Sequence, residues 1–213
     1  VKAIDLLTNK ELIVEGTSII NATGPWIDDL LEDETTELNK IIPTKGAHLV
    51  FAKEKFPITK AVYFDTQDGR MIFAIPEEGK VYVGTTDTYF QGDVADPKID
   101  EKDVDYLLLA CNLMFPEIKI QQTDIVSAWS GIRPLIYQKD KKPSEISRKY
   151  EIYQDAFGVF TIAGGKLTGY RKMAQKIVDQ VINNNFKHKN LNYCNTATYK
   201  LSGSDFKNPE VYE

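Results

Sequence analysis

Three basic side chains lie in apolar or glycine-rich segments, where their types suggest chemistry on an anionic molecule. His48 lies in an apolar run typical of a strand, and an imidazole can accept the proton of a hydroxyl group near neutral pH. Arg133 offers a planar fork that matches a phosphate or an alkoxide, and Lys166 offers a point charge. Strand alternation places His48 on one face with Gly46 and Val50. We therefore expect His48, Arg133 and Lys166 to surround one cavity that binds an anion.

Each of these residues also has a structural interpretation. A lone histidine in a strand is often a core residue whose polar atoms are satisfied, since burial without a partner is costly. Arg133 could lie at the surface or in a structural salt bridge, although Gly131 and Pro134 interrupt the strand around it. The residues alone leave these alternatives open.

Lys166 follows two glycines at a predicted junction of strand and helix. Residues 160–182 are typical of a short apolar strand, the pair Gly164 and Gly165, and an amphipathic helix. Glycine allows close approach of the backbone to a ligand, and a helix N-terminus presents free N–H groups to an anion or a polarised carbonyl. An ordinary turn is the alternative. The face expected to be buried comprises Leu167, Tyr170, Ala174, Ile177, Val178, Val181 and Ile182.

A second junction of the same kind lies near the start of the chain. Residues 17–22 form an apolar strand, Gly24 and Pro25 form the turn, and Asp28 and Asp29 lie in the first turn of a short helix. A plain turn glycine is the alternative for Gly24. Two such junctions with β-rich sequence between them predict a nucleotide-binding domain interrupted by an inserted domain.

The inserted segment is predicted to be an antiparallel sheet with one helix packed on it. The helix covers residues 100–115, with Asp100 as N-cap, and should bury Val104, Leu107, Leu108 and Cys111. Residues 139–142 of this segment predict a charged loop, and outside it residues 1–16 predict a hairpin and the residues after 183 a loose tail. The predicted strands of the sheet are 42–52, 61–66, 70–76, 80–86 and 124–136, and two more at 150–154 and 159–163 return the chain to the first domain.

The composition excludes several classes of protein. Among 213 residues, 42% are hydrophobic, which is enough for a core, and the net charge of −5 with interspersed signs disfavours a nucleic-acid partner. Cys111 and Cys194 have no spacing that suggests a pair, so we expect reduced thiols. No apolar run approaches the roughly 20 residues of a spanning helix. We assign no metal ligands.

Five motifs in this order resemble those of the flavin-dependent, quinone-linked glycerol-3-phosphate dehydrogenases of the D-amino-acid-oxidase-like superfamily. The resemblance extends through about residue 205. It implies an α+β or α/β fold in which a partial FAD-binding, Rossmann-like domain (1–41 and 151–190) is interrupted by an antiparallel substrate domain (42–150), with a tail at 191–213. The motifs are INATGPW (20–26), KGAHLVF (45–51), GTTDT (84–88), SGIRPL (130–135) and AGGKLTGYRK (163–172).

The resemblance also implies roles for individual residues. His48, Arg133 and Lys166 match catalytic and substrate-binding positions for glycerol 3-phosphate, with His48 as proton acceptor and Arg133 stabilising charge on the reacting oxygen. Asp87 matches a family motif, and we interpret it as a structural cap of a turn. The residues implied in FAD binding are Gly24, Gly164, Gly165, Lys166, Leu167 and Thr168. Quinone would accept the electrons, with the complete enzyme cytoplasmic and peripheral at the inner membrane face.

One departure from the family pattern affects what this chain can do. The family begins with G-x-G-x-x-G, but none of the thirteen glycines here forms that fingerprint, and the chain starts at Val1. We therefore expect a piece of a longer enzyme that lacks the first βαβ unit and, in isolation, is inactive and holds no FAD. The alternatives are a glycerol-3-phosphate oxidase that uses oxygen, a relative of the amino-acid oxidases, and a non-catalytic phosphate-binding or assembly module. The oligomeric state is not predicted.

Overall fold

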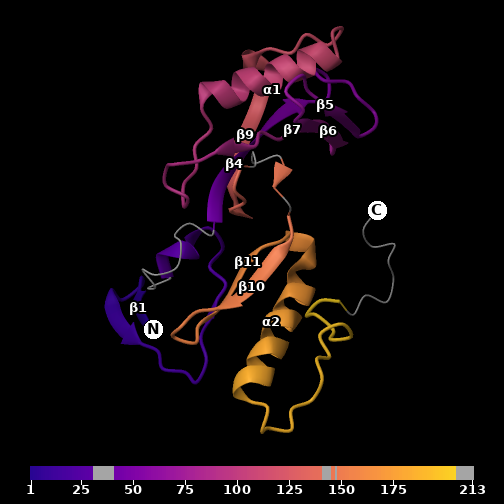
Figure 1. Ribbon diagram of the computed structural model, residues 1–213. Helices are drawn as coiled ribbons and strands as arrows, with labels where there is room; N and C mark the ends of the chain where they lie inside the picture. The colour runs from indigo at the N-terminus through magenta and orange to yellow at the C-terminus, as the bar shows by residue number, and fades with distance from the viewer. Residues whose placement is uncertain (31–40, 141–144, 147, 205–213) are drawn as a thin grey trace.

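The computed structural model describes residues 1–30, 41–140, 145–146 and 148–204. Two main sheets each carry one helix, and the chain passes between them through the long strands β4 and β9 (Figure 1). A separate hairpin pairs β1 (Lys2–Asp5) with β2 (Lys10–Ile13), as predicted.

The larger sheet is antiparallel throughout, and β4 is its central strand. Its order is β5-β6-β7-β4-β8, with β9 on the other edge of β4. The strands are β4 (Ile41–Ala52), β5 (Val62–Asp65), β6 (Met71–Glu77), β7 (Lys80–Gly84), β8 (Thr88–Tyr89) and β9 (Ile125–Ile136). Apart from the two-residue β8, which was not predicted, these confirm the predicted strands within a few residues.

A loop of three residues lies beside the middle of β4. β7 pairs with the second half of β4 and β8 with the first half, so the chain leaves this edge after Gly84 and rejoins it at Thr88. Thr86 fills the gap, because its hydroxyl accepts a hydrogen bond from the amide of Ala47 at 2.9 Å. The loop is thereby fixed against the strand that carries His48.

The core lies between one face of this sheet and α1 (Glu101–Met114). Asp100 caps the helix as predicted, and it forms a capping box with Asp103 in which each side chain accepts from the other's backbone amide. The predicted helix face packs against the core, with Leu107 and Cys111 buried. The strand residues on the same side include Ala47, Leu49, Phe51, Ile72, Ala74, Val81 and Val83.

A buried cation joins β4 to the start of α1. Lys45 lies on the helix side of β4, and its Nζ is 2.6 Å from Asp103 and 3.0 Å from Asp100. Burial lowers the pKa of Lys45, but the hydrogen bonds and charges of Asp103 and Asp100 outweigh it and hold this pKa above its ordinary value. The ion cluster therefore fixes the end of α1 against the central strand.

The smaller sheet has the order β10-β11-β3 and connects residues distant in the sequence. β10 (Tyr150–Gln154) is antiparallel to β11 (Phe160–Gly164), and β11 is parallel to β3 (Ile20–Asn21). α2 (Tyr170–Asn185) packs beside this sheet (Figure 1). The single turns η1 (Gly24–Trp26) and η2 (Asp28–Leu30) follow β3, and η5 (Leu167–Gly169) leads into α2.

The predicted buried face of α2 was partly wrong. Ile177 and Val181 are buried against β11, together with the partly buried Met173. Leu167 and Tyr170 are 89% and 62% exposed, and Ala174 and Val178 are exposed as well. Residues 173, 177 and 181 form one stripe of the helix, and a three-stranded sheet covers only that stripe.

The two cysteines, the segment after α2 and the loop at 139–142 were also subjects of prediction. Cys111 is a buried free thiol and Cys194 an exposed one. The segment after α2 has no regular secondary structure in its described part, but it is not wholly detached, because Arg171 donates to Thr196 at 3.2 Å. Much of the predicted charged loop, residues 141–142, lies outside the described residues. Among the described helices, none has the length and apolarity needed to span a bilayer.

Candidate active site

Arg133 projects from β9 across the open face of the larger sheet, opposite the face that α1 covers. Its Nη1 donates to the Asp87 carboxylate at 2.7 Å and to the Thr86 carbonyl at 3.3 Å, while Nη2 donates to the Thr85 hydroxyl at 3.0 Å. The side chain is 25% exposed. The loop between β7 and β8 thus fixes the guanidinium.

The guanidinium occupies the space above a glycine of β4. A Cβ placed on Gly46 would lie 2.2 Å from Nη1 of Arg133 and 2.7 Å from its Cζ, so any side chain would displace it. Gly46 precedes His48 by two residues and therefore shares its face of the strand. Arg133 consequently reaches a position adjacent to the imidazole.

His48 lies in an aromatic setting on this face. Its ring stacks on Trp129 with 4.8 Å between centroids and 5° between planes, and the Phe73 ring is 5.6 Å away. A Cβ on Gly84, its partner on β7, would lie 2.3 Å from the imidazole Cδ2. Two glycines therefore give room to the two side chains that the sequence singles out.

The surroundings keep the imidazole neutral. Burial lowers the pKa of His48 to about 4, and the positive charge of Arg133 acts in the same direction. Nδ1 is buried without a hydrogen-bond partner among the described residues. At neutral pH the ring can thus accept a proton, but as a weaker base than an ordinary histidine.

We expect NMR titration of the imidazole carbons to give a pKa near 4 for His48. Assignment is simple, because the chain has two histidines and His188→Gln removes the other signal. Arg133→Gln should raise the pKa of His48 by removing the neighbouring charge. Since the unfolded chain binds this proton near pH 6.5 and the folded chain near pH 4, the free energy of unfolding should fall as pH drops from 6.5 to 4. A pKa above 6 in the folded chain would contradict this environment.

Asp87 is not the turn cap that we expected. Its carboxylate lies between two arginines, with Nη1 of Arg133 at 2.7 Å and Nη2 of Arg148 at 3.7 Å. Burial raises the pKa of Asp87, while the charges of both arginines oppose that shift. The local motif predicted a turn, whereas the observed partners are 46 and 61 residues away in the sequence.

Arg148 was missed by the sequence analysis. It lies in a polar, charged segment where a solvated loop is the default interpretation. Its side chain is 47% exposed, so it faces solvent at one end of the Asp87 carboxylate. A cation beside Arg133 could therefore add to the attraction of an anion.

The two strand-to-helix junctions lie at the same end of the smaller sheet, because β3 and β11 run parallel. Gly24, Gly164 and Gly165 have φ values of +63°, +70° and +83°, a region that favours glycine. No atom of the described residues lies within 4 Å of a Cβ placed on Gly24, so that junction is open on their side. In contrast, Gly164 and Gly165 are packed by protein atoms on their Cβ side.

Residues 166–168 are exposed at the second junction, where Lys166 is the N-cap of η5. Its ammonium group has no ion pair or hydrogen bond among the described residues. A Cβ on Gly164 would lie 2.9 Å from the Ile136 side chain, so this junction adjoins the end of β9, three residues beyond Arg133. The structure brings His48 and Arg133 together; no described contact joins Lys166 to either, and their common cavity stays a prediction.

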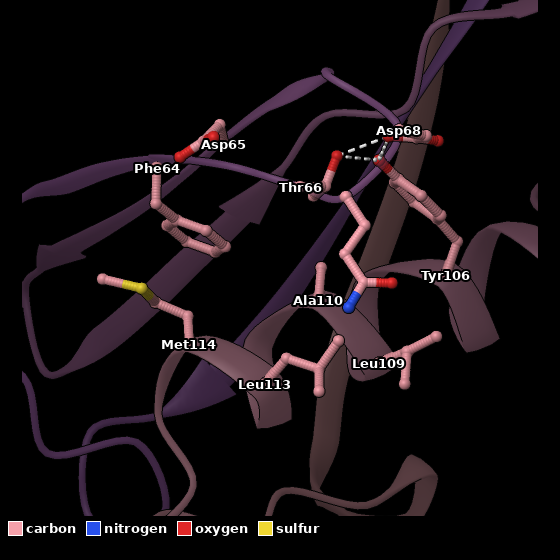
Figure 2. Close-up of a pocket in the computed structure, with 10 residues that line it drawn as sticks. Phe64, Asp65, Thr66, Asp68, Tyr106, Leu109, Ala110, Leu113 and Met114 are labelled. Carbon is pink, nitrogen blue, oxygen red and sulfur yellow. Dashed lines mark hydrogen bonds between the residues drawn. The ribbon is translucent and has the colours of Figure 1, made fainter.

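A separate cavity lies on the α1 side of the larger sheet, away from these residues. Its volume is about 340 Å³, and it lies between α1, which contributes Ala110 and Leu113, and the end of β5 with the following turn, which contribute Phe64 and Asp68 (Figure 2). Tyr106, Thr66 and Asp68 form hydrogen bonds at one end. In the described parts of the chain, no group of three or more His, Cys, Asp or Glu residues is placed to hold a metal.

Comparison with known proteins identifies relatives along nearly the whole chain. The model of the "FAD dependent oxidoreductase" family matches residues 2–170. The aerobic glycerol-3-phosphate dehydrogenase of Staphylococcus aureus strain USA300 is 51% identical over 209 residues, which are 96% of this chain and 38% of the relative. The chain thus spans about two fifths of the length of the curated relatives it matches.

Solved structures agree with the fold. The glycerol-3-phosphate dehydrogenase of Bacillus halodurans, complexed with FAD, is 43% identical, with a TM-score of 0.80 over 95% of this chain and 38% of that protein. Iminodiacetate oxidase from Chelativorans sp. BNC1 is 12% identical, with a TM-score of 0.55 over 91% of this chain and 47% of that protein, and shares the fold alone. These similarities confirm the predicted fold class.

Proposed function

This chain belongs to the FAD-dependent oxidoreductase family, and we propose on that premise that it carries the substrate site of an enzyme that oxidises glycerol 3-phosphate to dihydroxyacetone phosphate. The observation that carries the proposal is the position of a neutral imidazole beside a fixed guanidinium on the open sheet face. The names of the relatives supply the substrate.

Each basic residue of the site has a role in the proposed reaction that follows from its chemistry. The neutral His48 accepts the proton of the substrate hydroxyl, and the negative phosphate offsets the charge of Arg133 that weakens this base. Arg133 stabilises negative charge on the reacting oxygen. Lys166, whose ammonium group has no ion pair within the described residues, and the exposed Arg148 attract the phosphate. When bound, FAD accepts the hydride that leaves the substrate carbon.

The two junctions fit a cofactor that is held partly by backbone groups. Gly24 leaves open space beside β3, and residues 166–168 expose the start of a helix, whose N–H groups favour negative charge. In our proposal, Gly24, Gly164, Gly165, Lys166, Leu167 and Thr168 contact FAD. Leu167 supports this, because its 89% exposure suits an apolar side chain that covers a flat ring.

We further propose that the complete enzyme passes its electrons to quinone and lies at the inner face of the cytoplasmic membrane as a peripheral protein. Fractionation of cells should then find it with membranes, and high salt or alkaline washing should release it. Rapid consumption of oxygen with glycerol 3-phosphate would instead favour the oxidase alternative.

The activity is tested on the full-length protein that contains this chain, purified with FAD. Glycerol 3-phosphate should reduce a short-chain quinone through it, while glycine and iminodiacetate should not. Preference for an amino acid, or absence of turnover in a yellow, folded enzyme, would contradict the proposed function. The isolated chain should be colourless, and bound FAD in it would contradict our expectation about the missing fingerprint.

Arg133→Lys and Lys166→Ala should have different kinetic signatures in that enzyme. Arg133→Lys keeps the charge but loses the fork, so kcat and kcat/KM should both fall, by about 100-fold. Lys166→Ala removes a contact made in the ground state and the transition state alike, so KM should rise about 10-fold or more with kcat nearly constant. Steady-state kinetics separates the two, and near-wild-type constants for both variants would refute the site assignment.

A further inference from the structure

The contact between Asp87 and Arg133 is the strongest one at this site that the proposed function does not explain. Asp87 is the nearest charged partner of Arg133 among the described residues, at 2.7 Å, and its side chain is only 13% exposed. A carboxylate that merely ended a turn would not be expected to lie between two arginines, away from solvent. Its location suggests that the loop exists to hold Arg133.

Counting donors shows what this loop leaves free. A guanidinium has five N–H groups, and the three hydrogen bonds described for the Arg133 side chain go to Asp87, Thr86 and Thr85. Both hydrogens of Nη1 are used, and Nη2 uses one. Within the described residues, one hydrogen on Nη2 and one on Nε remain, and these atoms share an edge of the plane. That edge is the one that Asp87 does not hold, and Nε there can donate to an oxyanion.

The loop itself is firmly attached to β4. Thr86 accepts from the amide of Ala47 at 2.9 Å and donates to the carbonyl of Lys45 at 3.4 Å. Gly46 lies between these two residues and leaves its space to the guanidinium. The Arg133 guanidinium is therefore confined by the backbone of β4 on one face and by the loop at one edge. An unbranched side chain with several rotatable bonds thereby acquires a defined position.

We propose that Asp87 is a positioning residue, which holds one edge of the Arg133 guanidinium so that the opposite edge faces the reacting oxygen of the substrate. The proposal rests on the proposed function for the identity of that oxygen. The positioning itself can be measured without turnover. Asp87 touches neither substrate nor cofactor in this arrangement and acts chiefly through Arg133, because its contact with Arg148 is longer, at 3.7 Å.

The first test measures the motion of Arg133 in the chain itself. Among the chain's four arginines, the Arg133 signal is assigned by its loss in Arg133→Lys, and ¹⁵N NMR follows rotation about the bond from Nε to Cζ. This rotation should be slow in the wild type and fast in Asp87→Asn. Asp68→Asn is the matched control, because it releases Arg70 on the α1 side and should leave Arg133 unchanged. A slow Arg133 in Asp87→Asn would overturn the proposal.

The second test measures the consequence in the full-length enzyme. Asp87→Asn should lower kcat for glycerol 3-phosphate about 100-fold, as for a misplaced catalytic group, with a smaller change in KM. Asp87→Glu keeps the charge and should recover part of the loss, and it replaces the Asn variant if that variant fails to fold. Fast rotation with unchanged kcat would overturn the positioning role. A wild-type enzyme inactive on glycerol 3-phosphate, with Arg133 still released in Asp87→Asn, would refute the proposed function and leave the attachment of Arg133 intact.

Discussion

Gly46→Ala is expected to reduce kcat of the full-length enzyme by about 1,000-fold, near the upper end of the effect of losing one charge-stabilising donor. The new methyl group would lie 2.2 Å from Nη1 of Arg133, far inside any normal contact. The obstructing atoms are the end of a flexible side chain, so the guanidinium can move away while the strand stays in place. It would then lose its bond to Asp87. Activity should therefore suffer much more than stability.

Gly131→Ala is the matched control for this substitution. Gly131 lies directly opposite Gly46 in the β4–β9 ladder, but a Cβ there meets no atom within 4 Å in the part of the chain that the structure describes. The kcat and the urea midpoint of the Gly131→Ala variant should both stay near wild-type values. The site assignment would be wrong if Gly46→Ala retained full turnover, or if the two alanine variants lost activity equally.

Much of the fold could be predicted from the sequence, because its signals are local. The N-cap Asp100 and the apolar spacing behind it define α1, and apolar runs indicate the long strands β4 and β9 that precede and follow it in the sequence. The positive φ values of Gly24 and Gly164 agree with the junctions predicted from their neighbours. His48 and Arg133 could be chosen because each is a polar residue within an apolar strand.

The features that could not be predicted from the sequence depend on which residues face each other across strands. A glycine is needed at position 46 because the Arg133 guanidinium occupies the space of a Cβ there. Arg133 belongs to a strand that begins more than seventy residues later, so no local sequence rule reveals this requirement. Asp87 was assigned to a turn for the same reason, since its partners come from β9 and from the segment before β10. The face of α2 was predicted too broad, because the sequence does not reveal how wide the sheet beneath it is.

Lys45→Met is expected to destabilise the chain by about 3–5 kcal/mol, as when a buried ion pair loses one member. The side chains of Lys45 and Asp103 are 6% and 4% exposed, so the substitution leaves a carboxylate out of water without its cation. The loss should appear as a lower urea midpoint at pH 7 with an unchanged slope. Lys98→Met is the matched control, because Lys98 and Asp96 form an exposed pair, and it should change stability by less than about 1 kcal/mol.

The double variant Lys45→Met/Asp103→Asn distinguishes the effect of an uncompensated buried charge from the effect of lost packing. Asparagine can still accept the amide of Asp100, so the capping box survives while the buried negative charge is removed. If the uncompensated carboxylate causes the loss, the double variant should be more stable than Lys45→Met alone, although it carries one substitution more. Strictly additive losses would instead mean that Lys45 contributes mainly through the packing of its aliphatic stem.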